Sequence, residues 1–83
     1  MPEISVTIPV ANAWPSLDEL SARDAIMADL DAVSFGSSIG CGGGCGAVDF
    51  SYRVADAGAA TETVQRIVRE HLPAAVPQIR ITE

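Results

Sequence analysis

Apolar and polar residues alternate in two stretches of this 83-residue chain, which predicts two strands that each bury one face, and a third apolar stretch near the end predicts a short final strand. The apolar positions are Ile4, Val6, Ile8 and Val10 in the first stretch, Val48, Phe50, Tyr52 and Val54 in the second, and Val76, Ile79 and Ile81 in the last. A fourth, shorter strand is predicted over Phe35–Ile39, directly before a glycine-rich run. The sequence therefore predicts four strands, with a hairpin between the second and the third.

A first helix is predicted to begin at Ser16, because Ser16 and Glu19 have the spacing of a capping box. Its apolar positions recur at near-helical spacing and are Leu17, Leu20, Ile26, Met27, Leu30 and Val33. The last turns also carry Asp29 and Asp31, whose negative charge is unfavourable near the carboxyl end of a helix.

A second helix is predicted to begin after Asp56, whose side chain suits a capping position, and to end before Pro73. Its apolar stripe consists of Ala60, Val64, Ile67, Val68 and Leu72. On the exposed side, Arg66 lies four positions from both Glu62 and Glu70, so ion pairs are expected there.

The resulting order, β-α-β-β-α-β over residues 1–83, resembles the ferredoxin-like folds. The resemblance implies an α+β two-layer sandwich, with a four-stranded antiparallel sheet in the order 4-1-3-2 and both helices on one face. Phe50 and Tyr52 share a face with Val48 and Val54, so we expect them to lie under the helices. We expect a single domain, because so short a chain builds only one core.

Charge narrows the classes of partner. Eleven acidic residues against five arginines and no lysine give a net charge of −6 and a pI near 4.4. Such a chain is repelled by nucleic acid and by anionic membranes, so we expect neither as a partner. No basic leader followed by an apolar segment precedes the first strand, and we expect a cytoplasmic protein. The alanine-rich, lysine-free composition indicates a bacterium with a GC-rich genome.

The predicted hairpin contains Cys41 and Cys45, separated by Gly42, Gly43 and Gly44. A three-residue reversal would place the two thiols opposite each other. Three interpretations of the pair are open. The cysteines are two ligands of a metal site, they form a redox-active or structural disulfide, or they are small residues tolerated in a turn. A metal would need further ligands from Asp49, His71 or a second subunit, and a cytoplasm keeps thiols reduced, so we favour the turn. A phosphate cradle is disfavoured because no basic residue follows before Arg53.

Two single residues have alternative interpretations. Trp14, in the loop before the first helix, is interpreted as a lid on the core, with an interface anchor as the alternative. His71, the one histidine, is interpreted as a solvated residue at a helix end rather than a catalytic base.

The signatures of several families with this fold do not occur here. Copper-chaperone domains carry a CxxC motif after the first strand, where this chain has Ala11–Trp14. RNA-recognition domains expose aromatic and basic side chains on their sheet, and acylphosphatases carry an arginine in the loop after the first strand. We find neither pattern, and the fold alone assigns no function.

The leading hypothesis is a small, acidic, non-enzymatic protein-binding module, similar to bacterial immunity or adaptor proteins. Its candidate partner-binding residues are Trp14, Gly42, Gly43 and Gly44, and no cofactor is expected. The alternative is a thiol redox or metal-binding module in which Cys41 and Cys45 hold a metal ion or exchange electrons. The open edges of a four-stranded sheet are also compatible with a homodimer.

Overall fold

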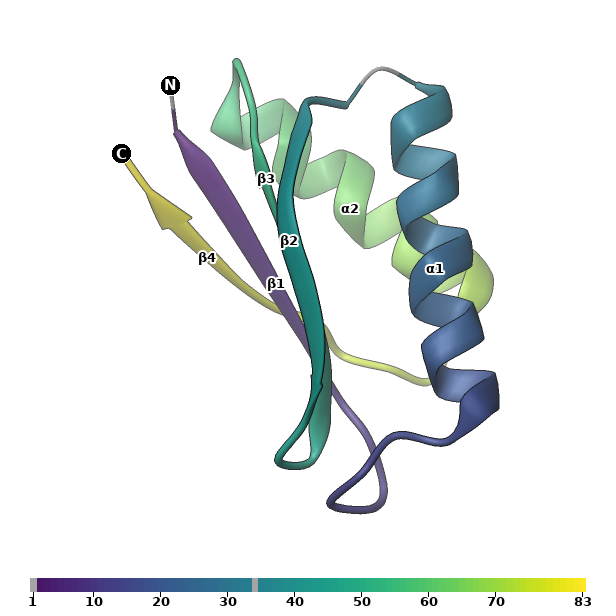
Figure 1. The fold of residues 1–83 in the computed structure, drawn as a ribbon. Coiled ribbons are helices and arrows are strands. Elements are labelled where there is room, and N and C mark those ends of the chain that lie inside the picture. The colour runs from purple at the N-terminus through teal and green to yellow at the C-terminus, as the bar shows by residue number, and fades with distance from the viewer. Residues whose placement is uncertain (1, 34) are drawn as a thin grey trace.

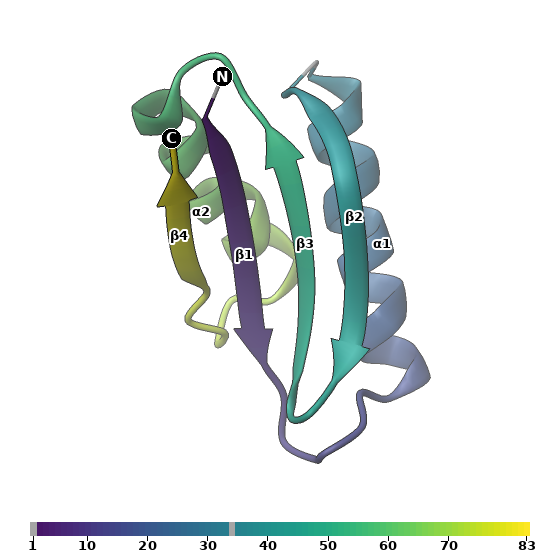
Figure 2. The same cartoon turned by 60° about the vertical axis from the view of Figure 1, so that its left-hand side comes forward.

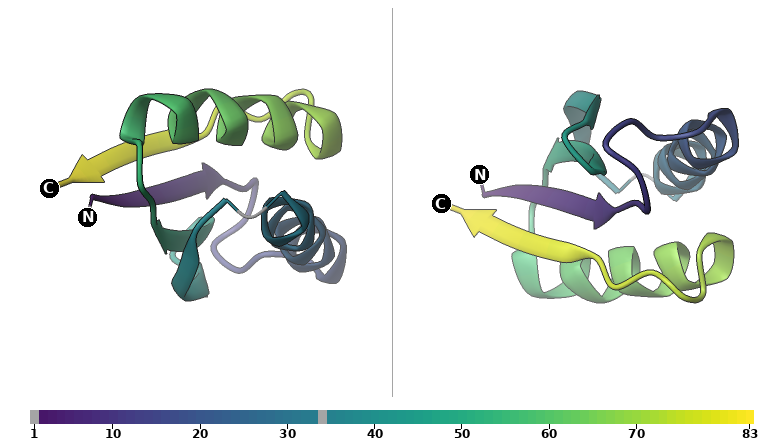
Figure 3. Two further views of the ribbon diagram at one scale, coloured as in Figure 1. Left: turned by 90° about the horizontal axis from the view of Figure 1, so that it is seen from above. Right: turned by 90° about the horizontal axis from the view of Figure 1, so that it is seen from below.

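The computed structural model describes residues 2–33 and 35–83, which form four strands and two helices in the predicted order. The elements are β1 (Glu3–Pro9), α1 (Leu17–Ala32), β2 (Ser37–Gly44), β3 (Ala47–Arg53), α2 (Ala57–His71) and β4 (Gln78–Thr82). The strands form one sheet in the order β2-β3-β1-β4, and every neighbouring pair is antiparallel. Both helices cover the same face of this sheet (Figure 1, Figure 2). This confirms the ferredoxin-like sandwich, whose two layers are seen from either end in Figure 3.

The core lies between the sheet and the helices and is built by the predicted alternation. In the central pair of strands, Val6 lies opposite Phe50 and Ile4 opposite Tyr52, and all four side chains are buried. The helices contribute the remaining buried side chains, which are Ile26, Leu30, Ala60, Val64, Ile67 and Val68. Phe50 and Tyr52 therefore lie under the helices as expected.

Helix α1 begins at the predicted capping box. The backbone N–H of Glu19 donates to Oγ of Ser16 (3.1 Å), and the N–H of Ser16 donates to Oε1 of Glu19 (2.7 Å). Its buried face is narrower than the sequence predicts, because Leu17 and Val33 are exposed. Leu17 is the first helical residue and Val33 follows the last, so both lie at ends of the helix. No helix in residues 2–33 or 35–83 has the length and apolar character needed to cross a bilayer.

Helix α2 has the predicted cap and the predicted stripe. The N–H of Ala59 donates to Oδ1 of Asp56 (3.0 Å), and the stripe from Ala60 to Val68 is buried. The expected pairing of Arg66 with its two glutamates is wrong, since no ion pair within 4.0 Å includes Arg66 in the described part of the chain. These side chains remain in solvent, where such pairs contribute little.

The two acidic side chains near the end of α1 are contacted by polar side chains of α2 and β3. Nε2 of His71, at the end of α2, lies 2.6 Å from Oδ2 of Asp29, so the two helices are joined at this point. Oδ1 of Asp31 accepts from the hydroxyl of Tyr52 (3.0 Å). The interpretation of His71 as a solvated residue is therefore wrong, because it is half-buried and contacts a carboxylate.

The hairpin between β2 and β3 differs from the sequence prediction. Strand β2 does not end at Ile39 but continues through the glycine-rich run to Gly44, with one irregularity in register between Ser38 and Gly40. The turn is therefore only two residues long, Cys45 and Gly46, with φ angles of 53° and 81°. Positive φ at both central residues is typical of a type I′ turn, whose twist matches that of paired strands. Pairing with β3 thus outweighs the low strand propensity of glycine.

This turn gives a stability prediction. A non-glycine residue in the left-handed region costs about 1 kcal/mol, and asparagine tolerates that region better than cysteine. Cys45→Asn should therefore raise the free energy of unfolding by about 0.5–1 kcal/mol in urea titrations. Cys45→Ala is the matched control, because alanine keeps the strain and should give no gain. An equal gain from both substitutions would show that the backbone angle is not the cause.

Tyr52 gives a pH prediction. Burial raises the pKa of its phenol well above the usual value of about 10, and the hydrogen bond to Asp31 raises this pKa further. Above that pH the unfolded chain loses the phenolic proton and the folded chain keeps it, so stability should fall by about 1.4 kcal/mol per pH unit. Few other groups titrate there, because the chain has no lysine.

Urea titrations at increasing alkaline pH should show this loss, and Tyr52→Phe should reduce its slope. The absorbance of the phenolate reports the same event, because Tyr52 is the only tyrosine of the chain. A native phenol that ionises at its ordinary pH would contradict the prediction.

Candidate interaction surface

The loop between β1 and α1 is fixed to the tip of the hairpin. The N–H of Gly46 donates to the carbonyl oxygen of Ala13 (2.9 Å), and the N–H of Val10 donates to the carbonyl oxygen of Gly46 (2.8 Å). Figure 1 shows the loop and the hairpin tip together at the end of the molecule opposite both termini. The two segments therefore form one hydrogen-bonded platform, although they are far apart in the sequence.

Trp14 lies on this platform and not over the core. Its side chain is 75% exposed, so the prediction of a lid is wrong. A Cβ atom built on Gly44 would lie only 2.9 Å from Cζ3 of Trp14, which shows that the indole ring rests against the glycine backbone. The core is closed by strand and helix side chains, and the loop instead presents the tryptophan to solvent.

The other glycines of the run are approached on alternate faces by side chains of the same chain. A Cβ atom on Gly43 would lie 3.1 Å from Cγ of Pro15 and 3.3 Å from Cδ2 of Leu20, on the helix side. A Cβ atom on Gly42 would lie 3.4 Å from both carboxylate oxygens of Asp49, on the open face. Packing within the chain therefore explains part of the need for glycine at these positions. A role of Gly42, Gly43 and Gly44 in partner binding stays a prediction.

Helix α1 is also tied directly to the glycine-rich strand. Nη1 of Arg23 donates to the carbonyl oxygen of Gly42 (2.9 Å), while Nη2 of the same guanidinium lies 3.0 Å from Oδ1 of Asp24. The Arg23 side chain is only 14% exposed. This contact gives β2 a polar link to α1 where its glycines offer no side chains to pack.

The sequence predicted that the two cysteines face each other across the turn, and this prediction is wrong. Cys41 lies opposite Phe50 in the ladder and Cys45 is in the turn; both are exposed free thiols. At about 3.3 Å per residue, β2 carries the chain some 10 Å from Cys41 to Gly44. A disulfide needs Cα atoms within about 7 Å, so the observed strand separates the pair too widely for one.

The further metal ligands considered from sequence lie elsewhere. Asp49 is on the open face of the sheet, whereas Cys41 is in register with a residue of the helix side, and His71 contacts Asp29. No three His, Cys, Asp or Glu side chains gather in a metal-binding arrangement within residues 2–33 and 35–83. The metal and redox interpretations of Cys41 and Cys45 stay predictions without added support.

The two edges of the sheet differ in character (Figure 2). Strand β4 has five residues, follows Pro77 directly and carries Arg80. Strand β2 has eight residues with the sequence SSIGCGGG, none of them charged and none proline. Proline, charge and shortness are the usual means of protecting an edge from pairing. Beyond the irregularity near Ile39, β2 therefore has none of this protection.

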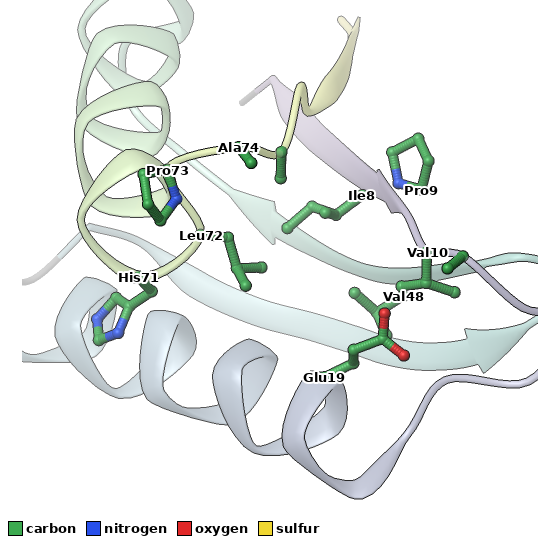
Figure 4. Close-up of a pocket in the computed structure, with 11 residues that line it drawn as sticks. Ile8, Pro9, Val10, Glu19, Val48, His71, Leu72, Pro73 and Ala74 are labelled. Atoms are coloured by element: carbon green, nitrogen blue, oxygen red, sulfur yellow. The ribbon is translucent and has the colours of Figure 1, made fainter.

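A cavity of about 500 Å³ opens between the end of β1, the first turns of α1 and the end of α2 (Figure 4). Its lining is mostly apolar and includes Ile8, Val48 and Leu72, with Glu19 and His71 as its charged or titratable members. Both of these are already engaged, Glu19 in the helix cap and His71 with Asp29. The sequence did not indicate this cavity, because the loop that follows α2 forms one of its walls.

Comparison of the chain with protein-family models, with curated proteins and with solved structures found no match. The candidate sites therefore come from the structure, and they are the platform, the β2 edge and the cavity. From the sequence we expected Trp14, the glycine-rich run and open sheet edges, but not that the unprotected edge is β2. The signal for the edge was the absence of charge and proline from residues 37–44, which becomes informative only when the strand order is known.

Proposed function

We propose that this protein is a non-enzymatic module that binds a protein partner through the platform formed by the hairpin tip and the β1–α1 loop. The observation that carries the proposal is the exposure of Trp14 on a backbone fixed by hydrogen bonds. Tryptophan is among the residues that contribute most at protein interfaces. A tryptophan that is exposed on an ordered platform, and not used to fill the core, is well suited to that role.

The geometry also lowers the cost of association. The indole ring rests on Gly44, and the loop is held at Ala13 and Val10, so a partner need not order this segment on binding. Leu17, at the start of α1 and three positions after Trp14, is 82% exposed and adds apolar area. The platform thus offers Trp14 on a framework that is already formed, and exposed Leu17 follows it closely in the chain at the start of α1.

The charge of the chain supports a basic protein surface as the partner. A net charge of −6 favours a basic protein surface and disfavours nucleic acid and anionic lipid. Complementary charge mainly increases the association rate and makes it dependent on salt. We infer that the partner is a protein with a basic binding surface. We also propose that the two proteins meet in the cytoplasm.

The first prediction from this proposal concerns Trp14. Affinity capture from a lysate of the native cells should recover the same protein with the unmodified chain and with Val76→Ala, and should lose it with Trp14→Ala. Truncation of such an anchor costs about 2 kcal/mol or more of binding, or about 30-fold in affinity.

Val76 is the matched control because it is an apolar side chain of similar exposure, 77%, in the loop before β4. Both variants should keep the thermal stability of the parent within about 0.5–1 kcal/mol, since neither side chain is buried. Equal recovery with the Trp14 variant, or no specific protein with any variant, would contradict the proposal.

The second prediction separates this function from thiol chemistry. Replacing Cys41 and Cys45 together by serine should leave capture of the partner unchanged, because binding by the platform needs neither thiol. Loss of capture in the double variant, together with metal bound to the unmodified protein in a native mass spectrum, would favour the alternative module. Single serine variants show which thiol is responsible in that case.

A further inference from the structure

Strand β2 lies at an edge of the sheet and pairs with β3 alone among the described strands. An edge strand presents unpaired N–H and C=O groups along its length, and proteins normally protect such an edge. Over Gly40–Gly44 the strand has a regular register with β3, is uncharged, and bears one side chain, that of Cys41. Steric hindrance to an incoming strand is therefore minimal along this segment.

A carboxylate marks the open face of this edge. Asp49 belongs to β3, but both of its carboxylate oxygens lie beside Gly42, close to where a side chain of the edge strand would stand. Asp49 is exposed, and no hydrogen bond or ion pair of its side chain is found in the described residues. A side chain of an added strand, opposite Gly42, would lie about 5 Å away from that position. A lysine or arginine there would reach the carboxylate.

The helix-facing side of the same edge is apolar at Gly43, and at Gly42 it carries the Arg23 guanidinium, which already donates to the carbonyl oxygen of Gly42 (2.9 Å) and lies beside Asp24. Gly43, which is in register with the buried Val48, is approached on this side by Pro15 and Leu20. Because side chains of a strand alternate between faces, an added strand would direct every second residue toward this apolar side. The edge thus favours a segment in which basic and apolar residues alternate.

We propose, on the basis of the function inferred above, that the partner contributes an extended basic segment that pairs with Gly40–Gly44 as a fifth strand of the sheet. Main-chain hydrogen bonds provide the affinity of such strand addition, and alternate side chains provide its specificity. A lysine or arginine of the segment pairs with Asp49, and its apolar residues pack toward Pro15 and Leu20.

A second copy of the chain fits this edge less well than a basic segment. Two copies paired through β2 around Gly42 would bring two Asp49 carboxylates to the same face of the joined ladder, where like charges repel. Each copy also carries a net charge of −6. The glycines would bury little apolar area in return, since they have no side chains.

The test uses the full chain, isotope-labelled for backbone NMR, and an end-blocked peptide of about seven residues that alternates lysine and valine. Addition of the peptide should shift the amide signals of residues 40–44 and slow their hydrogen exchange. A peptide that alternates glutamate and valine, and a lysine–valine peptide with a central proline, should give neither effect, because one is repelled and the other cannot complete the ladder.

Three variants assign the contacts. Asp49→Asn should weaken binding of the lysine–valine peptide up to about fivefold, as expected for an exposed ion pair, and Glu62→Gln, which removes an equal charge on α2, should not. Gly40→Lys should abolish binding by adding a protective charge to the edge. Its Cβ atom would meet nothing within 4 Å, so this variant is expected to fold, and its amide spectrum verifies that.

Peptide signals confined to the cavity or to Trp14 would overturn strand addition while leaving the protein-binding function intact. The same holds for absence of binding by the lysine–valine peptide, or for a concentration-dependent dimer through β2. Failure of the capture experiment with Trp14 would instead remove the function itself. The two results are therefore distinguishable.

Discussion

The two-residue turn at Cys45 and Gly46 is the constraint on which the arrangement of the candidate surface depends. It fixes Gly44 opposite Ala47, and from there the ladder sets the register of β2 back to Gly40, where the irregularity near Ile39 interrupts it. A turn one residue longer would move Cys41 to the open face and Asp49 away from Gly42. Gly46 of the same turn makes both backbone hydrogen bonds to the β1–α1 loop, donating to Ala13 and accepting from Val10, so the position of Trp14 depends on this turn as well.

Much of the fold follows from local patterns in the sequence. The alternation around Val6 and Phe50, the capping box of Ser16 and the stripe of α2 each act within a few residues, and each is found where it was predicted. The end of β2 is different, because glycine has little intrinsic preference for a strand. Only the partner strand β3, with its strong alternation, extends β2 to Gly44, and this cross-strand effect cannot be read from the glycine run itself.

The candidate site was less predictable for a related reason. Trp14 is a residue type that is mostly buried, but here it is exposed in a loop that two backbone hydrogen bonds join to a segment more than 30 positions away. The acidic end of α1 is a similar case. Asp29 and Asp31 are unfavourable within their own helix, and the side chains that compensate them, His71 and Tyr52, come from α2 and β3. Long-range partners of this kind are set by the packing of the layers and leave no local signal.

An exposed, uncharged edge strand carries a risk, because any extended segment with free backbone groups can pair with it. The negative charge of the chain limits this risk without closing the edge. Copies of the protein repel one another, whereas a basic segment is attracted, so charge separates self-association from binding of a partner. The glycines make the edge sterically accessible, and Asp49 places a negative charge beside it. The surface can therefore remain open to strand addition and still be selective.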